Sequence, residues 1–416
     1  MAILFNMIKK LSTILFSLLL VSNCFAQNVK VETGADLFLT EYSKIFKTKK
    51  IGLITNSAGT LSNGKPFYKE LLDNKFTISA IFSTEHGFGI NYADGHNINN
   101  SSTGKDSIPI ISIYGIAKKI TPEMLKNVDV LIFDLPAIGA RFFSYISTLF
   151  YSLQASAQNN IPIVLLDRPV PINGINVEGP VIEKELESFV GIAPLPIRYG
   201  MTVGELANYF INENLLGTKL KPGLITVKLK GWKRNLYFDD YAKNWIKPSP
   251  NIPDLETALI YPGTCLVEGT NVSEGRGTYR PFLTIGAPFI DSEDLIDELN
   301  DLGIKEIKIV PVKYIPKTIP GMAEKPKFED QSCNGISITI TNRKLFEPIS
   351  FSIKLLYALH NLYPGEFKFT NYFDNLSGNA SIRKDILAGM KPERIIASWQ
   401  KGLQEFKRIR NKYLLY

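Results

Sequence analysis

The chain has 416 residues, with 47 Lys and Arg against 40 Asp and Glu, a formal net charge of +7, and only three histidines and three cysteines. This length is too great for one hydrophobic core and predicts two domains. The charge is mild and both signs are spread along the chain, which argues against a nucleic-acid-binding surface. Without a CxxC or HExxH motif, we expect neither a built-in metal site nor a cofactor.

The first 26 residues have the pattern of a secretory signal peptide. Two lysines precede the apolar run at residues 11–21, and Ala26 offers a small residue before the cut. This run is too short to span a membrane, and no later segment reaches the length of a span. We therefore expect an exported protein, periplasmic or secreted. Lipid anchoring through Cys24 is less favoured, because Asn23 is a poor residue before a lipidated cysteine.

From residue 50 to residue 229, short apolar runs alternate with helical patterns. Alternating strands and helices indicate parallel βαβ units and an α/β fold with a doubly wound parallel sheet. The predicted strands are residues 51–55, 76–82, 108–114, 128–133, 161–166 and 224–229, and the predicted helices are 66–73, 121–127, 140–158 and 202–214, the last with a capping box completed by Glu205.

A proline-rich stretch at residues 245–253 interrupts the alternation, and we place the domain junction there. Beyond it the pattern is mixed, with helices at residues 292–300, 349–362, 381–388 and 392–407 and strands at 307–312 and 335–341. The prediction is a signal peptide over residues 1–26, an α/β domain over 27–250 and a smaller α+β domain over 251–416.

The loops at the carboxyl ends of parallel strands form the ligand crevice in such a sheet, and this rule selects candidate residues. Glu85 follows the second predicted strand and can act there as a general acid, or it can simply cap a helix or pair with a basic residue. We expect His86 to orient Glu85. Asp134 follows the fourth strand and either binds ligand hydroxyls or caps the next helix. Arg141 lies at the predicted start of that helix, where the macrodipole disfavours a cation, so an anion in the cleft or an ion pair with Asp134 would explain it.

Residues 268–282 form a polar stretch with two carboxylates, two arginines and three glycines, and they show no hydrophobic periodicity. The stretch is either a loop that lines a site or a solvated surface loop. Because it follows the junction, it can face the strand-end loops of the first domain, and ligand sites favour such interfaces. Glu268, Glu274 and Arg276 are its candidate functional residues.

Several kinds of chemistry lose support because their motifs are absent. The sequence has no GxGxxG after the first strand, no Walker loop and no GxSxG elbow. A hydrolase using Ser83 or Ser273 would have no histidine partner besides His86. Hydrolysis of a glycoside by paired carboxylates fits the inventory of residues. Cys265 and Cys333 either pair or remain two buried thiols.

Seven motifs in the same order resemble the exo-β-N-acetylmuramidase family called NamZ, and the likeness covers nearly the whole chain after residue 26. They lie at residues 52–56, 84–87, 133–141, 166–169, 196–205, 248–253 and 268–278. The sequence departs from the family pattern at Thr84, where the family usually has proline, and at Leu135 and Pro136, where it often has Gln-Asp.

The resemblance implies a Rossmann-like N-terminal domain, a smaller C-terminal domain, a cleft between them, and release of N-acetylmuramic acid from the non-reducing ends of peptidoglycan fragments. It places the family's proposed catalytic glutamate at Glu85. Glu268 or Glu274, with Asp134 behind them, would be the second carboxylate, unless the sugar's acetamido group replaces it. Arg276 or Arg141 would bind the lactyl carboxylate of muramic acid. Further candidates for substrate binding are Asn251 and Asn271. A non-catalytic exported binding protein for cell-wall sugars is the alternative.

Overall fold

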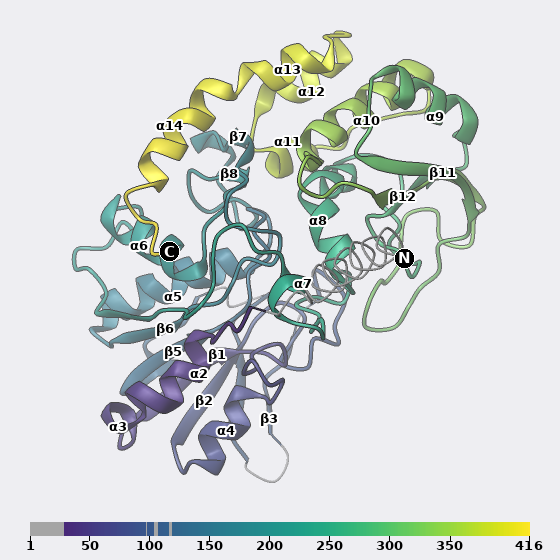
Figure 1. Ribbon diagram of the computed structural model, residues 1–416. Helices are drawn as coiled ribbons and strands as arrows, with labels where there is room; N and C mark the ends of the chain where they lie inside the picture. Colours follow the sequence, from purple (N-terminus) through teal and green to yellow (C-terminus); the bar gives the residue numbers. More distant parts are fainter. Residues whose placement is uncertain (1–28, 97, 104–106, 116–118) are drawn as a thin grey trace, which may run out of the picture.

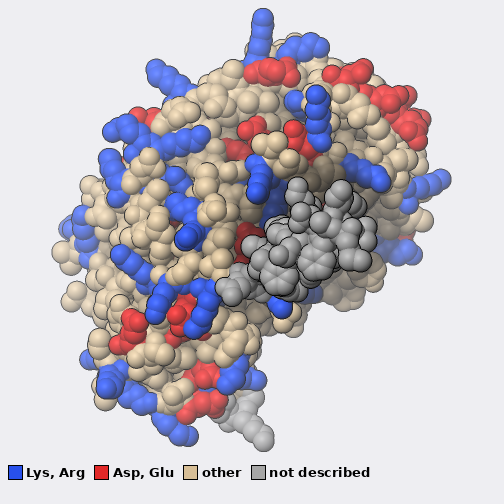
Figure 2. All heavy atoms as spheres, in the orientation of Figure 1, with Lys and Arg blue, Asp and Glu red and all other residues tan. Residues whose placement is uncertain are grey.

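The structure is a computed structural model that describes residues 29–96, 98–103, 107–115 and 119–416 (Figure 1). The predicted signal peptide and Cys24 lie outside the described residues. On the face shown in Figure 2, basic and acidic side chains are interspersed. No helix within the described ranges has both the length and the apolar character that crossing a membrane requires.

A seven-stranded sheet in the order β3-β4-β2-β1-β5-β6-β9 forms the centre of the N-terminal half of the described chain. All its neighbouring strands pair in parallel except β3 and β4. Because the strand order runs outward in both directions from β1, the sheet is doubly wound, with its switch point between β1 and β5. The α/β prediction is therefore confirmed. The strands are β1 (Lys50–Thr55), β2 (Thr77–Ser83), β3 (Ser101–Ser102), β4 (Pro109–Ser112), β5 (Val130–Asp134), β6 (Ile163–Leu166) and β9 (Leu224–Val227).

Helices cover both faces of this sheet (Figure 1). The alternation along β5 shows why: Ile132 packs into the core on one face, and Leu131 and Phe133 pack into the core on the other. The first core includes residues of α2 (Gly34–Leu37), the π-helical turn η1 (Phe38–Tyr42), α3 (Ser43–Phe46) and α4 (Phe67–Asp73), and the second includes those of α5 (Tyr145–Asn159) and α6 (Val203–Asn212). The predicted capping box starts α6, where Thr202 and Glu205 each bond the other's backbone N–H.

Two helices predicted in the N-terminal half differ in the structure. Residues 121–127 form only the short 3₁₀ turn η2 (Glu123–Leu125). The helix predicted over residues 140–158 begins at Tyr145, because Ala140 bridges to Arg198 and the Arg141 N–H donates to the Ile197 carbonyl. These contacts hold residues 140–144 outside the helix.

The C-terminal half contains a three-stranded antiparallel sheet in the order β10-β12-β11. The predicted helix over residues 392–407 is divided at Trp399 into α13 and α14. The remaining elements are β7 (Glu178–Val181), η3 (Lys184–Leu186), β8 (Pro196–Arg198), α7 (Phe238–Tyr241), α8 (Leu255–Thr264), η4 (Cys265–Gly269), β10 (Thr284–Ala287), α9 (Ser292–Asp301), β11 (Ile307–Tyr314), β12 (Cys333–Ile340), α10 (Pro348–Leu362), α11 (Tyr372–Ser377), α12 (Ala380–Leu387), α13 (Pro392–Ser398) and α14 (Gln400–Arg410).

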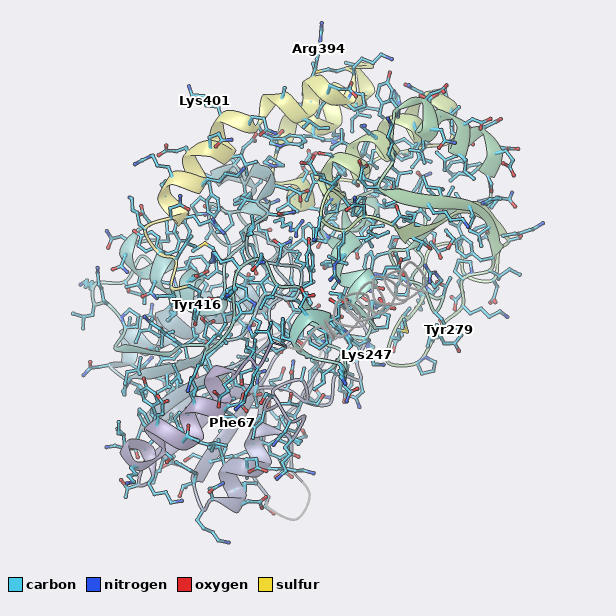
Figure 3. The ribbon with its side chains drawn as sticks, viewed as in Figure 1. Phe67, Lys247, Tyr279, Arg394, Lys401 and Tyr416 are labelled. Atoms are coloured by element: carbon cyan, nitrogen blue, oxygen red, sulfur yellow. The ribbon has the colours of Figure 1, made fainter. Side chains whose placement is uncertain are left out.

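The end of the chain returns to the N-terminal half (Figures 1 and 3). Arg410 at the end of α14 donates to the Gly200 carbonyl, and the Tyr416 hydroxyl donates to Asp167 at 2.7 Å. One hydrophobic core also runs through both halves, since it contains Leu149 of α5 and Leu356 of α10. The two halves are therefore joined by core packing and by the returning terminus.

Candidate active site

A cavity of about 220 Å³ lies between the strand-end loops of the N-terminal half and the η4 region of the C-terminal half. Two sets of residues far apart in the sequence form its charged lining. Glu85, His86 and Asp94 come from the loop after β2, and Glu268 and Arg276 come from the polar stretch after α8. The polar stretch therefore lines a site.

Glu85 is held in this cavity by three hydrogen-bond donors. Tyr114 Oη donates to Oε1 at 2.7 Å, the Gly95 N–H donates to the same oxygen at 3.3 Å, and Ser144 Oγ donates to Oε2 at 2.5 Å. Burial, and then the charge of Glu85, raise the pKa of Tyr114, so its hydroxyl remains a donor at neutral pH. The carboxylate thus has a fixed orientation at the cavity wall.

Tyr114, Ser144 and Asp94 were not among the sequence candidates. Tyr114 lies just beyond the carboxyl end of β4, so the strand-end rule that selects Glu85 also selects Tyr114. Ser144 directly precedes α5 and Asp94 lies in the loop after β2, and no sequence signal distinguishes them from ordinary loop residues.

His86 does not orient Glu85 through a hydrogen bond, contrary to our expectation. Its Nδ1 lies 2.9 Å from the carbonyl oxygen of Tyr92, and since a carbonyl only accepts, Nδ1 carries the proton. Burial lowers the pKa of His86, against the opposing effect of Glu85. The ring is therefore neutral near pH 7, with Nε2 as an acceptor, and the residue lines the cavity beside Glu85.

Arg276 joins carboxylates from both halves of the chain. Its Nη2 lies 2.7 Å from Glu268 Oε1, and its Nη1 lies 2.9 Å from Asp94 Oδ1. Burial raises the pKa of the Glu268 carboxyl; Arg276 opposes this effect, and the charges of Glu274 and Asp94 add to it. Glu268 is therefore a second carboxyl group in the cavity that can carry a proton more readily than a free glutamate.

Three other candidates from the sequence lie outside the cavity lining. Glu274 is buried and bound by Lys327 at 3.0 Å. Asn271 uses its side chain on the backbone of Glu366 and Lys368. Asn251 is 1% exposed and donates to the Met322 carbonyl. None of these three residues lines the cavity, although Glu274 Oε1 lies 3.5 Å from Nε of Arg276.

Asp134 and Arg141 also lie away from the cavity, and they do not pair with each other. Asp134 is fully buried, with Oδ1 2.6 Å from Nη2 of Arg168. Arg141 is 1% exposed and donates to the carbonyls of Pro180, Leu195 and Leu376. Its guanidinium thus connects the N-terminal half to α11, and its partners are neutral backbone carbonyls in place of the expected anion or Asp134.

The serine alternatives gain no support from the geometry. Ser83 and Ser273 are buried and lie outside the cavity lining, and the proton of His86 Nδ1 is directed at a carbonyl. Cys265 and Cys333 are two free, buried thiols. Burial raises the pKa of both, so neither is a reactive thiolate near neutral pH.

Comparisons with known proteins agree on one family. The models described as exo-β-N-acetylmuramidase NamZ, N-terminal and C-terminal, match residues 51–256 and 259–416. The peptidoglycan β-N-acetylmuramidase NamZ of Bacillus subtilis (strain 168) is 42% identical over 397 residues, which are 95% of this chain and 93% of the relative. Crystal structures of two DUF1343 family proteins from Bacteroides fragilis NCTC 9343 match with TM-scores of 0.84 and 0.74 at 29% and 30% identity, each covering 93% of this chain and 99% of the other. The chain belongs to the exo-β-N-acetylmuramidase NamZ family.

Proposed function

We propose that the protein is an exo-acting glycoside hydrolase that releases N-acetylmuramic acid from the non-reducing ends of peptidoglycan fragments during cell-wall turnover. The observation that carries the proposal is one cavity that brings together the carboxyl groups of Glu85 and Glu268, with the guanidinium of Arg276 in the same lining. Paired carboxyl groups are the usual equipment for glycoside hydrolysis. Membership of the family and the curated relative support the same reaction.

The size of the cavity favours action at a chain end. Sites for drug-sized ligands usually measure about 300–1,000 Å³, whereas this cavity measures about 220 Å³. It therefore suits one sugar residue and not several consecutive residues of a glycan chain.

We assign to Glu85 the role of general acid, which protonates the departing glycosidic oxygen as the bond to the anomeric carbon breaks. Its neighbour Ser144 suits both protonation states, because a hydroxyl that donates to the carboxylate can rotate and accept from the carboxylic acid. The Tyr114 hydroxyl keeps the other oxygen in place throughout.

Glu268 is our candidate for the second carboxylate, as the base that deprotonates the attacking water or as the nucleophile. Glu274 is less suitable because it is buried against Lys327 outside the cavity. Attack by the sugar's own acetamido oxygen remains the alternative route, and in that case Glu268 would position this group.

Arg276 is our candidate for binding the lactyl carboxylate that distinguishes muramic acid from glucosamine. It is the arginine that lines the cavity, and its planar guanidinium suits a carboxylate. A site built to pair with a charged group discriminates strongly against a substrate that lacks it.

The signal-peptide pattern supports export, to the periplasm or the medium. No described helix could hold the protein across a membrane, and peptidoglycan lies outside the cytoplasmic membrane, where an exported enzyme would meet its fragments.

The test is incubation of residues 27–416 with N-acetylmuramyl-β-1,4-N-acetylglucosamine, with both free sugars measured by chromatography. The disaccharide of reversed order, with N-acetylglucosamine at the non-reducing end, is the matched control. We expect release of both sugars from the first substrate only. Calorimetric binding of the first disaccharide without cleavage would instead identify a non-catalytic binding protein.

A further inference from the structure

A second and larger cavity, of about 370 Å³, lies in the N-terminal half. Its lining includes Ala58 after β1, Pro136 after β5 and Arg168 after β6, and α7 with the loop that follows it closes the opposite side. Because Ala58, Pro136 and Arg168 follow the ends of their strands, the cavity occupies the carboxyl edge of the sheet at the β1/β5 switch point, where doubly wound folds bind small ligands. It shares no lining residue with the candidate active site.

The wall of this cavity is mainly apolar and aromatic. Phe238, Tyr241 and Trp245 contribute rings, and four prolines, at positions 136, 169, 171 and 248, contribute rigid apolar surface. Trp245 is fixed by a 3.0 Å hydrogen bond from its Nε1 to the Ile252 carbonyl. Such a wall suits a flat apolar body that stacks on the indole ring.

The charged side chains of the lining are Arg168 and Lys243, and the lining contains no Asp or Glu. Arg168 is held rigidly, with Nε 2.7 Å from Asp134 Oδ1 and Nη2 2.8 Å from the Thr60 carbonyl oxygen, whereas Nη1 makes no hydrogen bond with any described residue. The guanidinium is thus preorganised, with one end available to a ligand.

The Tyr241 hydroxyl adds a neutral donor to these two cations. Burial raises the pKa of Tyr241, against the opposing charge of Arg168, so the phenol is protonated near neutral pH. The active-site cavity differs in character, because the carboxyl groups of Glu85, Asp94 and Glu268 line it. These groups would repel any anion that is not paired with Arg276.

We propose that this cavity is a second ligand site, which binds a small organic carboxylate with a flat apolar body. The carboxylate lies between Arg168 and Lys243, and the body packs on Trp245. A carboxylate shared by a buried guanidinium and a lysine at the rim gains charge-assisted hydrogen bonds that a neutral isostere cannot make.

Benzoate and its uncharged isostere benzamide are the probes, and tryptophan fluorescence is the measurement. Trp245 is the tryptophan of this cavity, while the other two of the chain, Trp232 and Trp399, are buried elsewhere. We expect benzoate to change the fluorescence saturably, with a dissociation constant on the order of 1 mM for so small a ligand. Benzamide should bind at least about tenfold more weakly, because one charge-assisted hydrogen bond is lost, and the Trp245→Phe variant should lose the signal.

Two charge-reversal variants form a matched pair. Lys243→Glu should weaken benzoate binding by roughly tenfold or more. Lys247→Glu should leave it unchanged, because Lys247 is an exposed lysine of the same segment outside the lining (labelled in Figure 3). Glu85→Gln should bind benzoate as the wild type does, which separates this site from turnover.

Three outcomes of the binding measurements would overturn the proposal. They are no saturable change up to roughly 20 mM benzoate, which exceeds the expected dissociation constant about twentyfold; equal binding of benzoate and benzamide; and equal effects of the two charge reversals. A crystal structure with benzoate between Glu268 and Arg276 would equally refute it. None of these results depends on whether the protein cleaves a muraminide.

Discussion

Tyr114 Oη lies 2.7 Å from Glu85 Oε1, so a residue just beyond the carboxyl end of β4 fixes the carboxyl group that we propose as the general acid. Tyr114→Phe removes this hydrogen bond and keeps the ring. A hydrogen bond to a charged group contributes about 1.5–3 kcal/mol, and we therefore expect kcat on the muramyl disaccharide to fall roughly 10- to 100-fold with little change in KM.

The control for this prediction is Tyr279→Phe, because Tyr279 (labelled in Figure 3) is 86% exposed and lies outside the cavity lining. Its kinetics should match the wild type. Equal kcat values for Tyr114→Phe and the wild type would show that Tyr114 does not position the reacting carboxyl group.

The roles of Glu85 and Glu268 can be separated by the leaving group. Nitrophenolate departs without protonation, so an enzyme that lacks only its general acid should still cleave the para-nitrophenyl muraminide. We expect Glu85→Gln to lose far more activity on the disaccharide than on the nitrophenyl substrate, and Glu268→Gln to lose both similarly. The reverse pattern would make Glu268 the acid, which its raised pKa allows.

Asp94 competes with the substrate for Arg276 if that arginine binds the lactyl group. Asp94 is 46% exposed, and its 2.9 Å contact with Arg276 Nη1 takes the place that a substrate carboxylate would use. An exposed ion pair contributes at most about 1 kcal/mol, so Asp94→Asn should lower KM for the muraminide by up to roughly fivefold and leave kcat unchanged. Asp330→Asn, which removes the exposed carboxylate 3.7 Å from Lys317 Nζ, is the control. A higher KM in Asp94→Asn would instead mean that Asp94 holds Arg276 in position.

The parallel sheet is predictable from the sequence because its central strands are buried on both faces and appear as short apolar runs. Helix α8 is not, because it is buried on nearly all sides and contains Pro262, so it shows neither a helical period nor an uninterrupted pattern. The start of α5 was wrong for a related reason: the bridge from Ala140 to Arg198 is a long-range contact that overrides local helical propensity.

The residues of the candidate site are likewise predictable from the sequence only in part. Glu85 reaches the cavity because the end of a parallel strand fixes its place, and the sequence reveals that end. The sequence cannot distinguish Arg141 from Arg276, since both lie in glycine-containing segments near carboxylates. Only the tertiary packing shows that carbonyls surround the first and carboxylates surround the second.

Arg141 therefore supports a prediction about stability. Arg141→Met would leave the carbonyls of Pro180, Leu195 and Leu376 without their buried donor, at a cost of at least about 3 kcal/mol. We expect a lower free energy of unfolding in guanidinium chloride, while KM of the protein that remains folded is unchanged. A selective rise in KM for the muraminide, without loss of stability, would return Arg141 to the list of substrate-binding residues.

Asp167 gives the fold a pH dependence opposite to that of an ordinary ion-paired carboxylate. It is fully buried at the end of β6 and accepts hydrogen bonds from Tyr416, Thr202 and Gly204. Burial raises the pKa of Asp167 to about 6, and these donors only partly offset the effect. The folded state therefore holds a proton that the unfolded chain, with an aspartate pKa of about 3.9, has already released.

Stability from this group is fully present below about pH 4 and is lost as the pH rises to about 6. A shift of about two pKa units corresponds to roughly 3 kcal/mol. We expect the free energy of unfolding of the wild type, measured relative to Asp167→Asn, to fall by up to this amount between pH 4 and pH 7 and then to stay level. The asparagine variant retains the shape of the side chain but cannot ionise, so every other titrating group cancels in the difference. Parallel curves for the two proteins would show that the donors at Asp167 outweigh its burial, and that the returning terminus is bound to a carboxylate of ordinary acidity.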